Sequence, residues 1–393
     1  MIQRDYLIVG AGVGAASACE GMRRYDKRGT ATMVSGEIFN PYKRWMLSKT
    51  FLREKQPPLK QLPLHDEKWY AAHKIEVRSG TFVTQFNIDR RLAVLSNGES
   101  IEFNKACLAM GSRAVRPPVA GVGLGNVIYL RTIRDAFALR EMGALEKTVV
   151  VVGGGLLACE TAASLRQLKI KVSIMHRHPH LLNRYLDPET GTWVTSYFEK
   201  HGITLLMGES LNGFEGKTVL RNIQTKSGNR VAAGVAVVAC GAEPNLDLVR
   251  NTPLSGPHGS PVTDYLETEE KGIYAIGDLA FYPDRLMGGM RRQTHWENAL
   301  EQGLVAGANM TGKKRIRYEQ IPYFWTEFFD LKMDFVGDFS IPPTRIELNG
   351  TYAKKKFVAR YYLGERLRAI LLCQANQKEV DNAKTQLRTA LGK

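Results

Sequence analysis

A short apolar run that ends in glycines and leads into a helix of small residues is the first regular pattern along the chain. Residues 6–9 read Tyr-Leu-Ile-Val, glycines follow, and a helix is predicted from about Val13 to Arg24. Residues 30–34 predict the next strand, so the segment forms one βαβ unit.

The same order of elements returns at residue 148. The run 148–152 predicts a strand, glycines follow it, a helix is predicted over 156–168, and 171–175 predicts the next strand. The chain therefore repeats one supersecondary unit and is not of low complexity.

Shorter strands are predicted between and after these units. Residues 76–94 contain short alternating strands, and Asn97-Gly98 has the composition of a hairpin turn. The apolar runs 231–239 and 272–276 are each stopped by glycine, which suits buried strands.

After about Tyr318 the pattern becomes a meander, with strands predicted at 332–337, 355–362 and 367–372. A polar helix is predicted from about Gln377. Its apolar positions form a thin stripe, namely Val380, Ala383, Leu387 and Leu391. Such a stripe suits docking on the body of the protein, because a membrane anchor needs a heavier one.

A length of 393 residues exceeds one ordinary core, so two or three domains are expected, with linkers near 116–118 and 241–244. Hydrophobic residues make up 44% and charged residues 24%, which is ordinary globular composition. No apolar run of about 18 residues is present and the sequence starts in a strand, so neither a transmembrane helix nor a signal peptide is expected.

The five cysteines are far apart, and none forms a CxxC or CxxxxC pair. This spacing disfavours a zinc site and a redox-active dithiol, so no metal is predicted, and it favours a cytoplasmic location. The formal charge of +15 is typical of a protein with an acidic protein, nucleic acid, anionic membrane or phosphorylated cofactor as partner. Part of that charge belongs to a solvated surface.

The segment 10–15 is a GxGxxA fingerprint, carried by Gly10, Gly12, Gly14 and Ala15. The glycines allow a tight turn close to a pyrophosphate, which would face the positive end of the helix. Glu37 is the carboxylate at the end of the second strand, where a ribose hydroxyl pair would be bound, although a solvated loop glutamate is the alternative.

Gly153, Gly155 and Leu156 lie in a second fingerprint, and two fingerprints imply two nucleotides. Each could otherwise be a glycine-rich turn with no ligand. His176 and Arg177 stand where an NAD-selective site would carry an acid, so the sequence favours NADPH, unless this basic cluster is only surface.

Residues 40–49 resemble the PYxRPPLSK segment of the ferredoxin reductases of dioxygenase and P450 systems and of apoptosis-inducing factor. Further similar segments follow in the family's order: 108–113, 153–160, 273–278, 294–299 and 322–326. The resemblance implies an α/β fold of glutathione-reductase-like architecture, with two Rossmann-like dinucleotide-binding domains and a smaller C-terminal α+β domain. The expected domains are FAD-binding at 1–115 and 244–317, NAD(P)H-binding at 116–243, and C-terminal at 318–393.

The resemblance implies FAD contacts at Gly10, Gly12, Glu37, Arg44, Lys49, Val83, Arg131, Asp278 and Trp296. His295 is assigned to the same group, although a structural role suits it equally. Gly241 is assigned to the NAD(P)H site. The chain departs from the family at Trp45-Met46, which replace Pro-Pro, at Lys43, which replaces Asp or Gln, and at Gly36, which replaces an acid.

Lys49, Glu160 and Trp296 are the implied catalytic residues. A fixed cation at Lys49 would stabilise negative charge on reduced flavin. Glu160 lies in an apolar stretch and should be paired, with Lys49 as the partner that the family suggests and Arg166 or Lys169 as surface alternatives. Trp296 could stack on flavin or nicotinamide, or pack between domains.

The resulting prediction is an enzyme that passes hydride from NAD(P)H to FAD and then electrons to an acidic ferredoxin- or rubredoxin-type protein. Candidate docking patches are basic: Arg291-Arg292, Lys313-Lys314-Arg315 with Arg317, and Lys354-Lys355-Lys356. The alternative is a redox-sensing flavoprotein similar to apoptosis-inducing factor, with a long-lived reduced flavin–NAD(P) complex and a protein or nucleic-acid partner. A quinone reductase at the membrane surface is disfavoured by the thin last helix, and a homodimer stays open.

Overall fold

The computed structural model describes residues 1–392, which divide into two compact units. Unit 1 contains residues 1–43, 60–113 and 243–324, and unit 2 contains residues 44–59, 114–242 and 325–392. Three of the unit boundaries fall within strands, namely β7 (Ser112–Ala114), β16 (Ala242–Pro244) and β21 (Tyr323–Phe328). The predicted boundaries of three domains stay a prediction.

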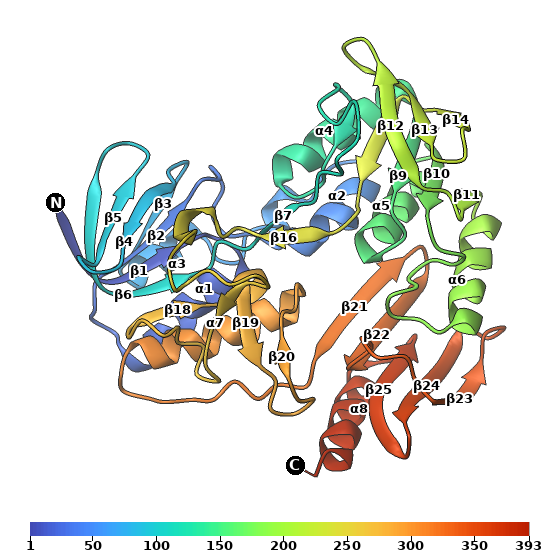
Figure 1. Cartoon of the computed structure of the whole chain (residues 1–393). Coiled ribbons are helices and arrows are strands. Elements are labelled where there is room, and N and C mark those ends of the chain that lie inside the picture. Colours follow the sequence, from blue (N-terminus) through green and yellow to red (C-terminus); the bar gives the residue numbers. More distant parts are fainter. Residues whose placement is uncertain (393) are drawn as a thin grey trace. The chain divides into compact units, whose positions relative to one another are not determined.

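Unit 1 is built on a sheet of order β3-β2-β1-β6-β5-β4, with β18 paired to β6 (Figure 1). The strands are β1 Ile2–Val9, β2 Ala31–Ser35, β3 Ile75–Ser79, β4 Val83–Asn87, β5 Leu92–Leu95, β6 Ser100–Leu108 and β18 Ile273–Ala275. Pairs β1–β2, β2–β3, β1–β6 and β6–β18 are parallel, as in a doubly wound fold. The β5–β6 pair is antiparallel, and Gly98 has φ +86° between them, so the predicted hairpin turn is confirmed.

The helices of unit 1 are α1 Val13–Tyr25, α3 Glu67–Ala72 and α7 Trp296–Met310, and its short strands are β17 Ser260–Pro261, β19 Ala280–Pro283 and β20 Met290–Arg291. Helices α1 and α7 touch through their backbones. A Cβ on Gly303 would lie 2.4 Å from Gly14 O, one on Gly307 would lie 2.0 Å from Ala18 O, and one on Gly21 would lie 2.2 Å from Leu304 O. Glycine is therefore required at this crossing.

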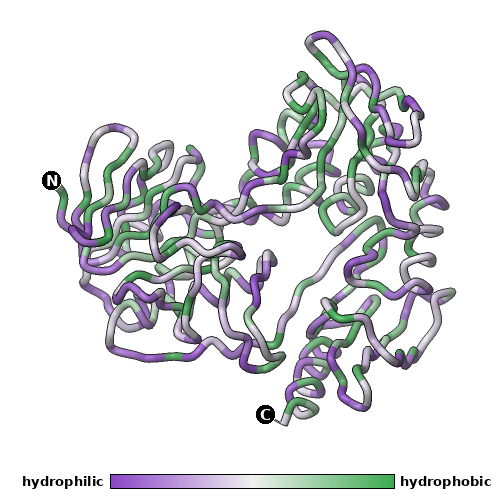
Figure 2. The backbone as a smooth tube through the Cα atoms, in the orientation of Figure 1, coloured by the Kyte–Doolittle hydropathy of each residue, from purple (hydrophilic) through white to green (hydrophobic). Residues whose placement is uncertain are grey.

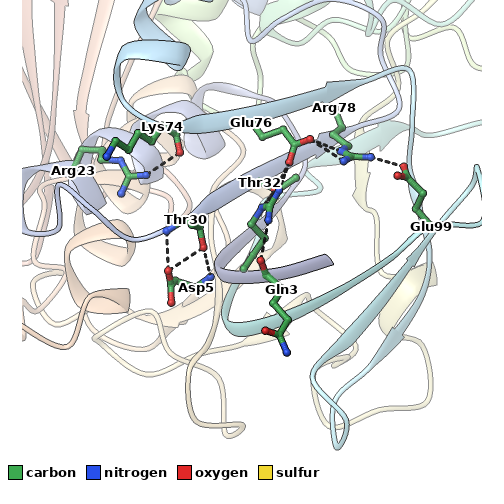
Figure 3. Close-up of polar contacts among 10 residues, drawn as sticks. Gln3, Asp5, Arg23, Thr30, Thr32, Lys74, Glu76, Arg78 and Glu99 are labelled. Atoms are coloured by element: carbon green, nitrogen blue, oxygen red, sulfur yellow. Dashed lines mark hydrogen bonds and ion pairs between the residues drawn. The ribbon is translucent and has the colours of Figure 1, made fainter. Parts of the chain in front are cut away.

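Polar side chains join the first three strands of unit 1 near the starts of the strands (Figure 3). Glu76 on β3 accepts from Arg4 at 2.8 Å, from Thr32 at 3.0 Å and from Arg78 at 2.9 Å, and Arg78 also pairs with Glu99. Burial raises the pKa of Glu76, but these bonds and charges outweigh it, so the pKa is lowered overall. The cluster holds β1, β2 and β3 in register.

Unit 2 contains a parallel sheet of order β11-β10-β9-β15-β8 and a small sheet of order β12-β13-β14. The strands are β8 Val127–Ile128, β9 Thr148–Val152, β10 Lys171–His176, β11 Thr204–Met207, β12 Leu211–Gly216, β13 Leu220–Thr225, β14 Arg230–Ala232 and β15 Val235–Val238. The helices are α2 Thr50–Arg53, α4 Ile133–Glu146, α5 Leu156–Gln167 and α6 Pro188–Lys200.

The prediction of one buried strand over 231–239 is wrong, since β14 and β15 belong to different sheets. Gly234 separates them where it approaches the end of α4. A Cβ on Gly234 would lie 2.5 Å from Glu146 Cβ, and its backbone N–H donates to Thr148 Oγ1 at 3.2 Å. The chain turns at Gly234, where only a residue without a side chain can lie so close to Glu146.

The C-terminal part of the chain, nearly all of it in unit 2, is a sheet of order β21-β22-β25-β24-β23 with helix α8. The elements are β21 Tyr323–Phe328, β22 Leu331–Gly337, β23 Arg345–Thr351, β24 Lys356–Leu363, β25 Arg366–Cys373 and α8 Gln377–Ala390. Val380, Ala383 and Leu387 are buried where α8 packs on β22 and β25, so three of the four predicted docking positions are present (Figures 1 and 2). The fourth, Leu391, follows the end of α8 and is half-buried. Figure 2 shows both hydrophobic and hydrophilic residues along this helix.

Candidate functional site

The first glycine turn lies between β1 and α1. Gly10 has φ +113°, and a Cβ there would lie 2.2 Å from Ala109 O, so no larger residue fits. Gly12 caps α1 with no side-chain hydrogen bond, and a Cβ there would meet nothing within 4 Å. Gly14 lies closer to its neighbours, with 3.1 Å to Ile276 Cδ1, and Ala15 is buried. The helix end is thus both uncapped and open.

Glu37 follows β2 and is held in place by a tyrosine. Tyr42 Oη donates to Glu37 Oε2 at 2.7 Å, and Glu37 N–H donates to Ser35 Oγ at 3.2 Å. Glu37 is half-buried, and Val83 is buried at the start of β4. The Glu37 carboxylate is therefore held just after the end of β2, and Glu37 is not a freely solvated loop residue.

Asp278 follows β18 and is buried. Ser112 Oγ donates to Asp278 Oδ2 at 2.5 Å, and the neighbouring Gly277 N–H donates to Gln302 Oε1 on α7 at 2.7 Å. Trp296 begins α7 and is half-buried, while His295 stacks on Phe324 with 4.0 Å between ring centroids. Unit 1 thus holds Asp278, His295 and Trp296 together with the first fingerprint.

The second glycine turn repeats the first in unit 2. Gly153 has φ +128°, and a Cβ there would lie 2.4 Å from Ala239 O. Gly155 caps α5 with no side-chain hydrogen bond, and a Cβ there would meet nothing within 4 Å. Leu156 begins the helix, and Gly241 has φ +127° just after β15.

Some of the described helices begin with a side-chain cap and others do not. Asp66, Thr132, Asp187 and Asn376 accept backbone hydrogen bonds at the starts of α3, α4, α6 and α8. Helices α1, α5 and α7 begin without such a cap, and so does the four-residue helix α2. Unpaired N–H groups at a helix start attract an anion, so the starts of the longer helices α1, α5 and α7 are suited to a phosphate or a polar ring edge.

His176 and Arg177 at the end of β10 differ in environment. His176 is buried, and its Nε2 lies 2.9 Å from Asn183 Oδ1. Burial lowers the pKa of His176 below its usual value, so the ring is neutral at pH 7. Arg177 is exposed, and its Nε lies 3.2 Å from His178 Nε2. Of the two, only Arg177 offers a positive charge to a ligand.

Lys49 and Glu160 form a buried ion pair in unit 2. Lys49 Nζ lies 2.7 Å from Glu160 Oε1, with side chains 4% and 7% exposed. Lys49 Nζ also lies 4.5 Å from the ring centroid of Trp325, and Trp325 packs edge-on against Trp45 at 5.2 Å. Glu160 therefore pairs with Lys49, not with Arg166 or Lys169 at the surface.

Two hydroxyl groups that sequence reasoning missed complete this pair. Thr326 Oγ1 donates to Glu160 Oε1 at 2.7 Å, and Ser48 Oγ donates to Glu160 Oε2 at 2.6 Å. Tyr42, Ser112 and Gln302 were also missed. The residues Tyr42, Ser48, Ser112 and Thr326 all lie within or next to the segments that resemble the family, which was the available signal.

Arg44 and Arg131 lie together in unit 2. Arg44 Nη1 donates to Arg131 O at 2.7 Å, and Arg131 N–H donates to Asp135 Oδ2 at 3.0 Å. The residues that the resemblance assigns to FAD are thus divided, with Arg44, Lys49 and Arg131 in unit 2 and the others in unit 1.

All five cysteines are free. Burial raises the pKa of each thiol, to about 12 for Cys19 and Cys373. Within residues 1–392, no group of three or more His, Cys, Asp or Glu residues could hold a metal ion. No helix in the same range has the length and apolar character needed to cross a membrane.

Comparisons with known proteins agree with this arrangement. The profile of the pyridine nucleotide-disulphide oxidoreductase family matches residues 4–303. The chain is 32% identical to the ferredoxin reductase component of chlorobenzene dioxygenase from Cupriavidus sp. (strain PS12), over 88% of this chain and 83% of that protein. It is 30% identical to the ferredoxin–NAD(+) reductase subunit of the benzene 1,2-dioxygenase system of Pseudomonas putida, over 94% and 88%.

Among solved structures, a chain of the covalent putidaredoxin reductase–putidaredoxin complex superposes with a TM-score of 0.92 and 27% identity. The match covers 99% of this chain and 94% of that chain. The predicted α/β fold of glutathione-reductase-like architecture is confirmed.

Proposed function

Because the chain belongs to the pyridine nucleotide-disulphide oxidoreductase family, we propose that it passes hydride from NAD(P)H to FAD and then electrons to a ferredoxin- or rubredoxin-type protein. It is an FAD-dependent oxidoreductase of the ferredoxin reductase type. The supporting observation is the pair of uncapped helix starts, α1 in unit 1 and α5 in unit 2, each behind a glycine that admits no Cβ.

The residues of unit 1 fit FAD. The open space at Gly12 and the N–H groups of α1 suit a diphosphate, and Glu37, oriented by Tyr42, suits a pair of ribose hydroxyls. Asp278, oriented by Ser112, would accept hydrogen bonds from a hydroxylated chain. The flavin supplies the chemistry of accepting a hydride and releasing single electrons.

The residues of unit 2 fit a pyridine nucleotide and supply the cation. Gly155 and α5 suit the second diphosphate. Lys49, anchored by Glu160, would stabilise negative charge on reduced flavin. The five free cysteines lack a paired dithiol, so we propose that electrons leave the flavin directly.

We propose NADPH as the preferred donor, with Arg177 as the residue that selects it. Arg177 is exposed, and the sequence after β10 contains no acid before Asp187, so Arg177 can attract a 2′-phosphate. His176 contributes no charge because burial lowers its pKa. The relative from Pseudomonas putida carries NAD(+) in its name, which makes this preference a point on which the chain would differ.

An acidic iron–sulfur protein is the proposed acceptor, since the net charge is +15. Several basic groups of the candidate patches have acidic neighbours: Arg291 Nε lies 3.0 Å from Asp284, Lys355 Nζ 2.8 Å from Asp330 and Lys356 Nζ 2.8 Å from Glu379. The 313–317 patch has acidic neighbours too, since Lys313 Nζ lies 3.7 Å from Asp26 and Arg317 Nε lies 3.3 Å from Asp264, while Arg315 lies over the Tyr265 ring at 4.3 Å. Ion pairs therefore do not single out one of the three patches for steering. A cytoplasmic location and a homodimer remain proposals.

An anaerobic titration tests the function. The absorbance of purified protein is recorded, NADPH and NADH are added in turn, and ferredoxin or rubredoxin is then added at several ionic strengths. We expect the absorbance spectrum of a bound flavin, and we expect NADPH to bleach it at a lower concentration than NADH. The rate at which the acceptor reoxidises the flavin should fall as the salt concentration rises. Colourless protein that cannot bind FAD, or bound flavin that neither nucleotide bleaches, would refute the proposal.

The second candidate is a redox-sensing flavoprotein similar to apoptosis-inducing factor. It is favoured by Trp45, which replaces the family's proline and packs its indole on Trp325 within 5.9 Å of Lys49 Nζ. A persistent long-wavelength absorbance after reduction, with slow turnover on every acceptor, would support this role instead.

A further inference from the structure

Glu160 accepts hydrogen bonds from three donors, and only one of them is charged. Lys49 Nζ and Thr326 Oγ1 share Oε1, each at 2.7 Å, and Ser48 Oγ reaches Oε2 at 2.6 Å. The carboxylate is 7% exposed, so water can replace little of this support. Each bond to a buried carboxylate is worth more than one between neutral groups, so each donor restricts how the carboxylate turns.

Thr326 is an exception to the pattern of its strand. The positions two before and two after it on β21 are Phe324 and Phe328, and all three are buried. A buried position between two aromatic residues would ordinarily be apolar, since an unneeded hydroxyl brings a desolvation cost. The Thr326 hydroxyl is satisfied by its hydrogen bond to Glu160, which indicates that this bond is the reason for a polar residue at the position.

Strand β21 contacts both members of the ion pair. Thr326 bonds the oxygen that holds Lys49, and the preceding residue, Trp325, places its indole 4.5 Å from Lys49 Nζ. Removing the Thr326 hydroxyl would let the Glu160 carboxylate rotate, and the Lys49 ammonium would move with it because it is paired with Oε1. The position of the Lys49 ammonium thus depends on a residue 166 positions away from Glu160 in the sequence.

We propose that Thr326 is a positioning residue for hydride transfer, which acts by fixing the Glu160 carboxylate and through it the Lys49 ammonium. This inference rests on the proposed function, and it assigns part of the redox centre to the C-terminal strand. It requires that the hydroxyl, and not the volume of the side chain, carries the effect.

The test compares isosteric variants in the FAD-loaded protein. Thr326→Val removes the hydroxyl and keeps the shape, and Thr326→Ser restores the hydroxyl. Thr161→Val is the matched control, because Thr161 is fully buried next to Glu160 in α5 and its Oγ1 has no hydrogen-bond partner among the described residues. Stopped-flow reduction by NADPH or NADH gives the limiting rate and the nucleotide Kd separately.

We expect Thr326→Val to lower the limiting rate of flavin reduction on the order of tenfold, with the nucleotide Kd unchanged. Thr326→Ser and Thr161→Val should stay within about threefold of wild type. In a Glu160→Gln background, Thr326→Val should add little, because both changes act on the same carboxylate. An unchanged Thr326→Val rate, failure of serine to restore it, or a fully additive double variant would overturn the inference.

A second measurement needs no turnover. The rate at which an acylating reagent modifies Lys49, followed by mass spectrometry of the apoprotein, should rise several-fold in Thr326→Val and stay near wild type in Thr326→Ser and Thr161→Val. Equal labelling in all proteins would overturn the inference even if hydride transfer occurs. Flavin that no nucleotide reduces in wild type would instead refute the proposed function, and the labelling rates would still decide the role of Thr326.

Discussion

The two glycine turns have nearly the same backbone but end in different chemistry. Gly10 and Gly153 share a positive φ and a close approach to a carbonyl oxygen, and Gly12 and Gly155 share open space at an uncapped helix. After the second strand, unit 1 presents Glu37 with Tyr42, whereas unit 2 presents Arg177. On the proposed function, the turn would accept a diphosphate in both units, and the residue at the strand end would distinguish one ribose from the other.

Within each turn the glycines divide their tasks. Gly10 and Gly153 are required by the fold, since a Cβ would clash with main-chain atoms. Gly12 and Gly155 have φ of −86° and −83°, which any residue adopts, so the fold does not require them. Alanine at these two positions therefore probes ligand binding with little effect on folding.

The largest expected effect comes from that pair. Gly12→Ala should weaken FAD binding on the order of 100-fold, about 2.7 kcal/mol, because the methyl group would occupy the space suited to the diphosphate. Gly155→Ala should weaken NAD(P)H binding by a similar factor and leave FAD bound. Fluorescence titration of the apoprotein with FAD, and of the holoprotein with NADPH, measures the two Kd values.

Thermal unfolding of the apoproteins is the control for this pair. The apoprotein Tm should change little in Gly12→Ala and Gly155→Ala but fall clearly in Gly10→Ala, which forces a left-handed backbone and a clash. If Gly12→Ala and Gly155→Ala each weakened both cofactors equally, the assignment of one nucleotide to each turn would be wrong.

Charge reversal at the second strand end should have the next largest effect. Arg177→Glu should lower the ratio of kcat/KM for NADPH over NADH by about 30-fold, roughly 2 kcal/mol, because a carboxylate repels a 2′-phosphate. Lys171→Glu, at the other end of β10, makes the same change in net charge and should leave the ratio unchanged. A wild-type enzyme that strongly prefers NADH would end the NADPH proposal.

The corresponding change in unit 1 should be smaller. Glu37→Gln should raise the Kd for FAD about tenfold, near 1.4 kcal/mol, since an amide accepts from ribose hydroxyls less strongly than a carboxylate. Tyr42→Phe should raise it only about threefold, because the carboxylate remains but loses its orienting bond. A larger loss in Tyr42→Phe than in Glu37→Gln would show that Tyr42 acts other than through Glu37.

The smallest effect is expected at His176. Burial holds its pKa below the usual value, so the ring is already neutral above about pH 6.5 and has no charge to lose as pH rises. The pH profiles of kcat/KM for NADPH in wild type and His176→Gln should therefore superpose between about pH 6.5 and 8. A profile that falls with rising pH only in wild type would show that the ring is protonated when NADPH binds.

Much of the fold could be predicted because its signals are local. Both βαβ units are short apolar runs with glycines and a small-residue helix, and the predicted helix from Val13 to Arg24 ends within one residue of α1. Strand β23 was missed because all seven of its residues are exposed, which leaves no buried face to read. Helix α4 was not predicted, although Thr132 and Asp135 form a capping box that marks its start.

The site was predictable only where residues carry charge or belong to a resemblance. Lys49 and Glu160 were paired through the family, since no periodicity relates positions so far apart. Ser48 and Thr326 are neutral hydroxyls, and a single buried threonine in a strand looks like any other β-branched residue. The family resemblance marks their segments, but only the distances to the Glu160 carboxylate show which group each hydroxyl meets.

The crossing of α1 and α7 at Gly21, Gly303 and Gly307 limits how this protein can change. Main chain rests on main chain there, so no side chain can be trimmed or enlarged to move one helix slightly past the other. The packing of the two helices therefore fixes the distance between the start of α1 and Trp296 at the start of α7. We therefore expect that changes to the loops before α1 and α7 alter the surroundings of a ligand bound at these helix starts. Such changes should leave the distance between the two helix starts intact.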